Sequence, residues 1–175
     1  MAVKKIKLNI DGQIFELPLD TLRTNNVGKK YIYLNAKNTA SIIKQYLKKI
    51  DPIISNWVTS QTYSMGCSVN VWVCNPDGSP VDDVLYKQIE KFAYDFQAGD
   101  FNGMDDSYSY RDDGTTANGT TLDYGAKYVF VENRPKFDTV EYALNSISKG
   151  ETVEDSIKYM RDDVKAKVRE MFKTK

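Results

Sequence analysis

The chain has 175 residues, of which 41% are hydrophobic and 27% charged, a composition that predicts one globular core in water and excludes two full-sized domains. It contains no histidine, which excludes imidazole metal ligands and every nucleophile activated by a histidine. The 24 basic and 24 acidic residues balance overall but not locally: residues 1–50 carry ten basic and three acidic side chains, residues 51–132 four and thirteen, and residues 133–175 ten and eight. Regions of one charge sign can attract partners of the opposite charge. The alternative is that these charged residues form ordinary solvated faces.

The N-terminal residues lack the apolar stretch of a signal peptide, and no segment approaches the ~18 apolar residues of a membrane span. We therefore expect a cytoplasmic protein with no membrane contact. Cys67 and Cys74 lie on opposite faces of one predicted strand and cannot pair within it. Two cysteines alone do not complete a zinc site, so no metal and no cofactor are expected.

The N-terminal third predicts a β-hairpin and a short strand. Residues 4–10 alternate between polar and apolar, Asp11-Gly12 is typical of a two-residue turn, and residues 14–19 alternate again. After a polar connection, residues 31–34 are expected to form another strand.

A helix and a second hairpin follow. Asn38 or Thr39 is the expected helix cap, and Asp51-Pro52 ends the helix. Residues 54–62 and 67–74 are rich in β-formers and predict two strands joined by a short loop. In the second of these strands the valines share one face, which is core, whereas Trp72 lies on the polar face. Trp72 is therefore either covered by another element or exposed for binding.

A second helix is predicted to start at Ser79 as cap with Pro80 at its first position, and to end at Gly99. Its expected buried stripe comprises Val81, Val84, Leu85, Ile89, Phe92 and Phe96. Beyond it we expect a strand around residues 108–110, a loop at 112–121 and a strand at 126–131 with Tyr128 and Phe130 on one face.

The order of elements predicts an α+β fold: an antiparallel sheet with helices on one face (an α-β-β-α-β-β core), an N-terminal β-hairpin and a C-terminal helical appendage. We expect the α+β domain at residues 1–134 and the appendage at residues 135–175, the latter as helices at 139–148 and 152–172. The apolar stripe of the last helix must be buried, and a homodimer through this helix is one way to bury it. That stripe comprises Val153, Ile157, Met160, Val164, Val168, Met171 and Phe172.

The stretch of residues 95–123 holds seven Asp against a single Arg111, and Tyr94, Tyr108, Tyr110 and Tyr124 lie within or directly beside it. A calcium loop of EF-hand type does not fit, because Gly103 comes too early and Arg111 stands where the bidentate Glu is needed. Adjacent Asp105 and Asp106 point in different directions and do not form an acid/base pair. The remaining interpretations are a recognition surface, in which Tyr supplies contact area and Asp supplies steering, and turn-forming Asp in solvated loops. The partner-binding candidates are Asp100, Asp105, Asp106, Tyr108, Tyr110, Asp112, Asp113 and Trp72.

The basic N-terminal third instead predicts a negatively charged partner, a nucleic acid. Lysines without interspersed arginines give at best weak, non-specific contact with phosphates, and Arg23 is the one arginine among them. The candidates for nucleic-acid contact are Lys29, Lys30, Lys44, Lys48 and Lys49.

Short motifs between about residues 31 and 134 resemble a family of large polyvalent protein-associated domains, which are small α+β modules of phages and conjugative elements. The motifs that carry the resemblance are Tyr33-Leu34-Asn35-Ala36-Lys37, Tyr63-Ser64-Met65-Gly66, Phe101-Asn102-Gly103-Met104-Asp105 and Ala126-Lys127-Tyr128-Val129-Phe130. The resemblance implies a binding protein of a mobile element that acts in the host cytoplasm, and some relatives are thought to counter host defences.

Together these observations predict a non-enzymatic protein that binds a host protein or nucleoprotein complex through the Asp/Tyr-rich surface and inhibits a host defence of anti-CRISPR or anti-restriction type. The alternative is a small nucleic-acid-binding accessory protein that uses the lysine-rich third.

Overall fold

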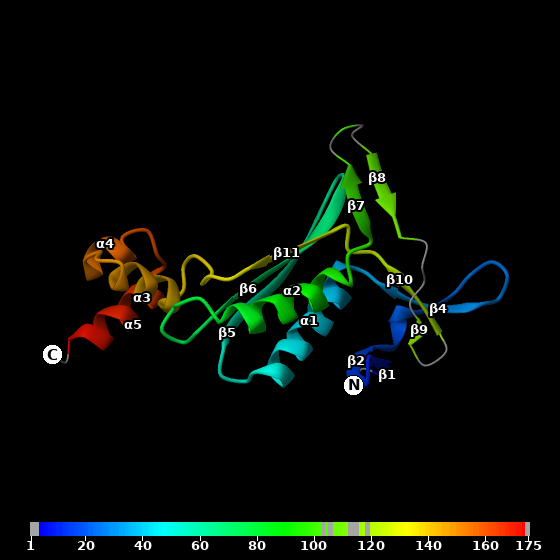
Figure 1. Cartoon of the computed structure of the whole chain (residues 1–175), viewed down its shortest axis with the longest axis horizontal. Helices are drawn as coiled ribbons and strands as arrows, with labels where there is room; N and C mark the ends of the chain where they lie inside the picture. The colour runs from blue at the N-terminus through cyan, green and yellow to red at the C-terminus, as the bar shows by residue number, and fades with distance from the viewer. Residues whose placement is uncertain (1–3, 103, 105–106, 112–115, 118–119, 174–175) are drawn as a thin grey trace.

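The computed structural model describes residues 4–102, 104, 107–111, 116–117 and 120–173 (Figure 1). Helices and sheets both contribute, which confirms the α+β class with an N-terminal hairpin and C-terminal helices. The strands are β1 (Lys5–Ile10), β2 (Gln13–Pro18), β3 (Leu22–Thr24), β4 (Lys30–Leu34), β5 (Ser55–Tyr63), β6 (Gly66–Cys74), β7 (Gly99–Asn102), β8 (Ser107–Tyr110), β9 (Thr116–Ala117), β10 (Thr120–Tyr124) and β11 (Tyr128–Glu132). The helices are the 3-10 turn η1 (Leu19–Thr21) and α1 (Ala36–Ile50), α2 (Asp83–Tyr94), α3 (Val140–Ser148), α4 (Val153–Ile157) and α5 (Asp162–Phe172).

The N-terminal hairpin forms as its turn residues dictate. Asp11 and Gly12 both adopt positive φ, 49° and 80°, the backbone that a two-residue turn between twisted strands requires. β1 and β2 pair antiparallel around this turn, so the predicted hairpin is confirmed.

The main sheet has the strand order β11-β6-β5, and a second sheet has the order β3-β4-β10-β9. β5 and β6 pair antiparallel, as predicted, but β11 runs parallel to β6 and β10 runs parallel to β4. The expectation of a purely antiparallel sheet is therefore wrong. The reason is that α2 carries the chain back along the sheet, so the strand that completes the sheet runs in the direction of β6, as in a crossover connection.

Both central helices start at caps that differ from the predicted ones. The side chain of Asn35 accepts a hydrogen bond from Asn38 N, so α1 begins three residues before Thr39. Asp82, not Ser79, caps α2.

The later start of α2 has a physical cause. The side-chain amide of Asn133 bonds both the N–H and the C=O of Val81, which keeps that residue outside the helix. As a result Val81 is buried before the helix begins, whereas Val84, expected in the buried stripe, is 78% exposed.

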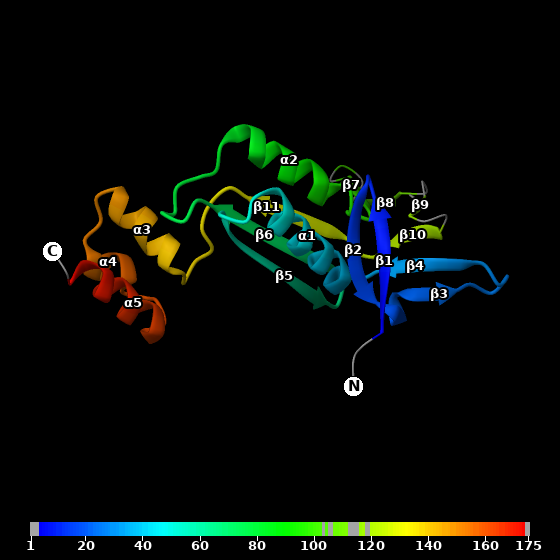
Figure 2. The ribbon, with the colours of Figure 1, turned by 90° about the horizontal axis from the view of Figure 1, so that it is seen from below.

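The helices α1 and α2 cover the same face of the β11-β6-β5 sheet, as predicted (Figure 2). The core between them combines alternate strand residues with the inner faces of the two helices. It includes Ala40, Ile43, Leu47, Val69, Val71, Val73, Ile89, Ala93, Val129 and Val131.

The three C-terminal helices lie at one end of the molecule and have a core of their own (Figure 1). The single helix expected over residues 152–172 is wrong, because the chain breaks between α4 and α5. At the break, Arg161 N donates to the side chain of Asp138 instead of to a helical carbonyl. Ile157, Met160, Val164 and Val168 are buried together with Ala143 of α3, so this part of the stripe is covered within the chain, whereas Met171 and Phe172 are exposed. The homodimer stays a prediction.

Candidate functional site: the uncovered face of the sheet

The face of the β11-β6-β5 sheet opposite α1 and α2 carries no helix in the part of the chain that the structure describes (Figures 1 and 2). Because neighbouring side chains of a strand alternate, the register puts Trp72 of β6 on this face, directly opposite Trp57 of β5. Both tryptophans are half-buried. On β11 the same face carries Tyr128 and Phe130, the latter 49% exposed.

Aromatic side chains continue from β11 onto the β7–β8 hairpin, which stands up beside the sheet (Figure 1). The rings of Tyr128 and Phe130 are nearly parallel, with centroids 6.1 Å apart. Tyr108 meets Tyr128 edge-on at 5.8 Å, and Tyr110 meets Tyr108 at 4.8 Å. We call the set Tyr110, Tyr108, Tyr128, Phe130, Trp72 and Trp57 the aromatic row.

Tyr108 is the fixed member of this row. Its hydroxyl donates to the carbonyl of Gly99 at 2.9 Å and also contacts the carbonyl of Lys127. Burial, helped by neighbouring tyrosines, raises the pKa of Tyr108 to about 12, so the hydroxyl stays a neutral donor at physiological pH. The strand carrying Tyr108 packs closely on β7, since a Cβ on Gly99 would lie 1.9 Å from Ser109 O.

Lysines lie over the aromatic row at two places. The ammonium of Lys127 is 4.8 Å from the ring centroid of Tyr108 and 5.5 Å from that of Tyr128. Lys136 lies 5.8 Å from the Trp72 ring. Both are at cation–π distance, which keeps positive charge directly above the aromatic surface.

A groove of about 660 Å³ lies where the sheet meets the C-terminal helices. Four aromatic side chains line it: Trp57, Trp72, Phe137 and Tyr159. Its described lining also has three cations, Arg134, Lys136 and Arg161, against one carboxylate, Asp138.

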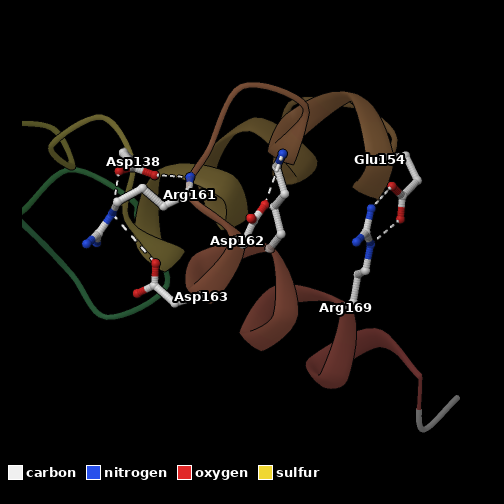
Figure 3. Close-up of polar contacts among 7 residues, drawn as sticks. Asp138, Glu154, Arg161, Asp162, Asp163 and Arg169 are labelled. Carbon is white, nitrogen blue, oxygen red and sulfur yellow. Dashed lines mark hydrogen bonds and ion pairs between the residues drawn. The ribbon is translucent and has the colours of Figure 1, made fainter.

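The carboxylates around the groove are paired. Asp138 accepts hydrogen bonds from Arg161 N at 2.7 Å and Arg161 Nε at 2.6 Å, and Arg161 also lies 3.7 Å from Asp163 (Figure 3). Glu132 forms an ion pair with Arg134. The hydrogen bond from the Arg161 backbone is the largest cause that lowers the pKa of Asp138, so this group is ionised at neutral pH.

The structure brings together three of the predicted partner-binding residues. Tyr108, Tyr110 and Trp72 all belong to the aromatic row. Asp100 is exposed on β7. The other four predicted residues lie outside the described part of the chain: Asp105, Asp106, Asp112 and Asp113.

Sequence reasoning did not assign Trp57, Tyr128, Phe130 and Lys136 to the site. A signal for Trp57 was present, because a two-residue turn after Tyr63 pairs Tyr63 with Gly66 and so sets Trp57 opposite Trp72. Lys136 could not be found this way, since its place over Trp72 depends on the path of the chain after β11.

The predicted lysine candidates do not form one surface. Lys44 and Lys48 are exposed on α1, whereas Lys29 and Lys30 lie on the β3–β4 hairpin at the far end of the molecule (Figure 1). Lys49 is used within the fold, because its ammonium contacts the carbonyl of Ile14 and lies over a phenyl ring of β2. Lys29 also lines a second cavity of about 550 Å³ that includes Tyr110 and Arg111.

Among the described residues, no three Cys, Asp or Glu side chains cluster in a way that would hold a metal ion. None of the described helices is both long and apolar enough to cross a membrane.

The family model of the large polyvalent protein associated domain 29 matches residues 34–137, which is 104 of the 175 residues. The chain belongs to this family. No curated protein and no solved structure matches the chain. Membership in the large polyvalent protein associated domain 29 family associates the protein with phages and mobile elements. The matched segment runs from the end of β4 to Phe137, so it includes the β11-β6-β5 sheet, both helices that cover it and the whole aromatic row.

Proposed function

We propose that this protein of a phage or mobile element is a non-enzymatic binding protein, and that it recognises a host macromolecule through the uncovered sheet face and its aromatic row. The observation that carries the proposal is the face itself: aromatic rings from β5, β6, β11 and β8 lie on one surface with no helix over them in the described chain. Exposed aromatic surface of this kind is characteristic of binding sites.

The chemistry of the surface supports binding rather than catalysis. The chain has no histidine to serve as a base near neutral pH. Of the carboxylates at the groove, Asp138 has its pKa lowered by its contacts with Arg161, which does not suit a group that must exchange protons near pH 7, and Glu132 is ion-paired with Arg134.

The family supports the biological setting. In this proposal the partner is a host protein or nucleoprotein complex in the host cytoplasm, and binding to it inhibits a host defence of CRISPR or restriction type. The Asp/Tyr-rich segment contributes through Tyr108 and Tyr110, which lie in the aromatic row.

The binding test compares capture from a host lysate by the tagged protein and by two matched variants. Phe130→Asp places a charge in the aromatic row at a half-exposed position. Ile53→Asp makes the same type of change at a 74% exposed position in the turn after α1. We expect the captured host component to be lost with Phe130→Asp and retained with Ile53→Asp; equal capture by all three proteins contradicts the assignment of the face.

The defence test uses cells that carry an active CRISPR or restriction system. Expression of the protein is expected to restore plaque formation by a targeted phage, and the Phe130→Asp variant is expected not to. Restoration by that variant would show that the sheet face is not the inhibitory surface.

A further inference from the structure

We propose that the groove and the aromatic row bind single-stranded nucleic acid, with bases stacked on the rings and phosphates held by the groove cations. This inference rests on the proposed function and names the chemical class of the partner. It assigns the contact to the opposite surface from the lysines of α1.

The groove combines aromatic and positively charged side chains. Four aromatic rings and three cations face one carboxylate, and that carboxylate is already bonded to Arg161. Arg134 is ion-paired with Glu132, and Arg161 with Asp138 and Asp163, so the positive charge that phosphates would meet beside the flat apolar surface is that of Lys136. A chain that alternates flat rings with negative charges is complementary to this arrangement of rings and cations.

The rings on β11 and β8 follow one another in contact. Phe130 and Tyr128 present successive rings along one strand, and Tyr108 extends them onto the hairpin. Base stacking on aromatic side chains of a sheet tolerates any sequence, because every base has a flat face. A duplex hides those faces, so single strands are the preferred form.

Polar side chains lie beside the rings on the same face of the sheet. Asn70 and Thr59 lie opposite each other across the β5–β6 pair on this face, and Phe130 pairs with Asn70 from the other side. An amide and a hydroxyl next to the rings can bond base edges or sugar hydroxyls. Lys127 lies over Tyr108 and Tyr128, and Lys136 lies over Trp72, so a strand that follows the row would meet a cation at both places.

The experiment uses the full chain and labelled single strands of about 15 nucleotides, as DNA and as RNA, with the duplex of the same sequence as comparison. The chain has two tryptophans, and both line the groove, so their fluorescence reports directly on this site. We expect quenching of tryptophan emission together with a rise in label anisotropy for a single strand, and weaker binding of the duplex. The DNA and RNA arms show which single strand is preferred.

Two variants and one control separate a binding role from a structural one. Phe130→Ala is expected to weaken binding by about fivefold or more, the loss of one base stack. Lys136→Gln is expected to lower the slope of log affinity against log salt by about 0.7, the value for one phosphate contact. Lys44→Gln with Lys48→Gln removes two exposed charges from α1 and is expected to leave emission quenching and affinity unchanged. The circular dichroism spectrum of each variant serves as the control that it is folded.

The inference is overturned if no strand binds with a dissociation constant below about 100 µM at low salt. It is equally overturned if binding leaves tryptophan emission unchanged and disappears in the Lys44 and Lys48 variant. Its failure is distinguishable from failure of the proposed function by repeating the lysate capture after nuclease treatment. If capture survives nuclease treatment but is lost with Phe130→Asp, the sheet face is still the binding surface and the partner is a protein.

Discussion

The carboxylate of Asp138 accepts two hydrogen bonds from Arg161, one from the backbone nitrogen at 2.7 Å and one from Nε at 2.6 Å. Asp138 adopts a positive φ of 65° at the point where the chain passes from the sheet to α3, and Arg161 precedes α5. This contact joins the segment before α3 to the residue before α5 (Figure 3). Both residues line the groove.

Replacing Asp138 by Asn should destabilise the C-terminal helices, because Asn tolerates the positive φ but carries no charge for Arg161. The measurement is the thermal unfolding midpoint. Glu154→Gln is the control: it removes an exposed ion pair to Arg169 between α4 and α5 but does not involve the start of α3. We expect a smaller decrease for this control, and an equal decrease in both variants would contradict the role of Asp138.

The same contact predicts a pH dependence with a definite sign. Since the pKa of Asp138 is lowered in the folded protein, its contribution to stability is present above the unfolded value of about 3.9 and is lost as the pH falls through the folded value. Unfolding curves of the wild type and of Asp138→Asn should therefore differ from pH 7 down to about pH 4 and converge at lower pH. A difference that persists unchanged at the lowest pH would argue against an electrostatic cause.

Gly78→Ala should loosen the C-terminal helices from the sheet. Gly78 has a positive φ of 84°, and a Cβ there would lie 2.0 Å from the carbonyl oxygen of Glu141 in α3. We expect a loss of about 1–3 kcal/mol in unfolding free energy. Gly150→Ala is matched in backbone, with φ 99°, but its Cβ would meet nothing within 4 Å, so its cost should be smaller.

Tyr108→Phe removes the hydroxyl that joins β8 to Gly99 and Lys127. The expected cost is about 0.5–1.5 kcal/mol in denaturant unfolding, the value of a hydrogen bond in a partly buried site. Tyr110→Phe, at a 65% exposed neighbour in the same strand, should be close to neutral.

Ile89→Ala should lower the free energy of unfolding by about 2–5 kcal/mol, because Ile89 is fully buried between α2 and the sheet. Val84→Ala on the same helix changes a 78% exposed side chain, and we expect an effect within about 0.5 kcal/mol. Similar values for the two variants would mean that α2 is rotated relative to the sheet.

Cys74 should resist alkylation in the folded protein. It is fully buried, and burial raises its pKa to about 12, which leaves very little thiolate at neutral pH. In a Cys67→Ala variant, iodoacetamide should add no mass until denaturant is present. Rapid labelling of the native variant would show that the end of β6 opens.

Local signals in the sequence were sufficient for the elements whose causes are local. Asp11-Gly12 specifies its turn, and alternation in β6 specifies which face is core. The start of α2 was not predictable locally, because it depends on Asn133, which lies 52 positions away. β10 was missed for the same reason: its first two residues lay in the predicted loop at 112–121 and the others had no assignment, because its one buried residue, Leu122, acquires a role only by pairing with β4.

The candidate site likewise combines features with a local cause and features that depend on distant segments. Trp72 was recognised as anomalous from its position on a polar face, whereas the groove requires residues from β5, from β6 and from the segment after β11. The residue pattern within one segment cannot show that residues from separate segments meet in space. The Asp/Tyr-rich segment was predicted as one surface, but Tyr108 and Tyr110 reach the aromatic row only because β7 and β8 fold into a hairpin beside β11.

The parallel pairing of β11 with β6 also sets an order of events during synthesis. The β5–β6 hairpin can close once residue 74 has left the ribosome, but Val129 joins Val69 only after the intervening chain has been made. At about 5–20 residues per second, the edge of β6 waits several seconds with its backbone groups unpaired. An unpaired edge next to a valine-rich face is a template for contact with other nascent chains. Premature termination before β11 should therefore yield an aggregating fragment rather than a smaller folded protein.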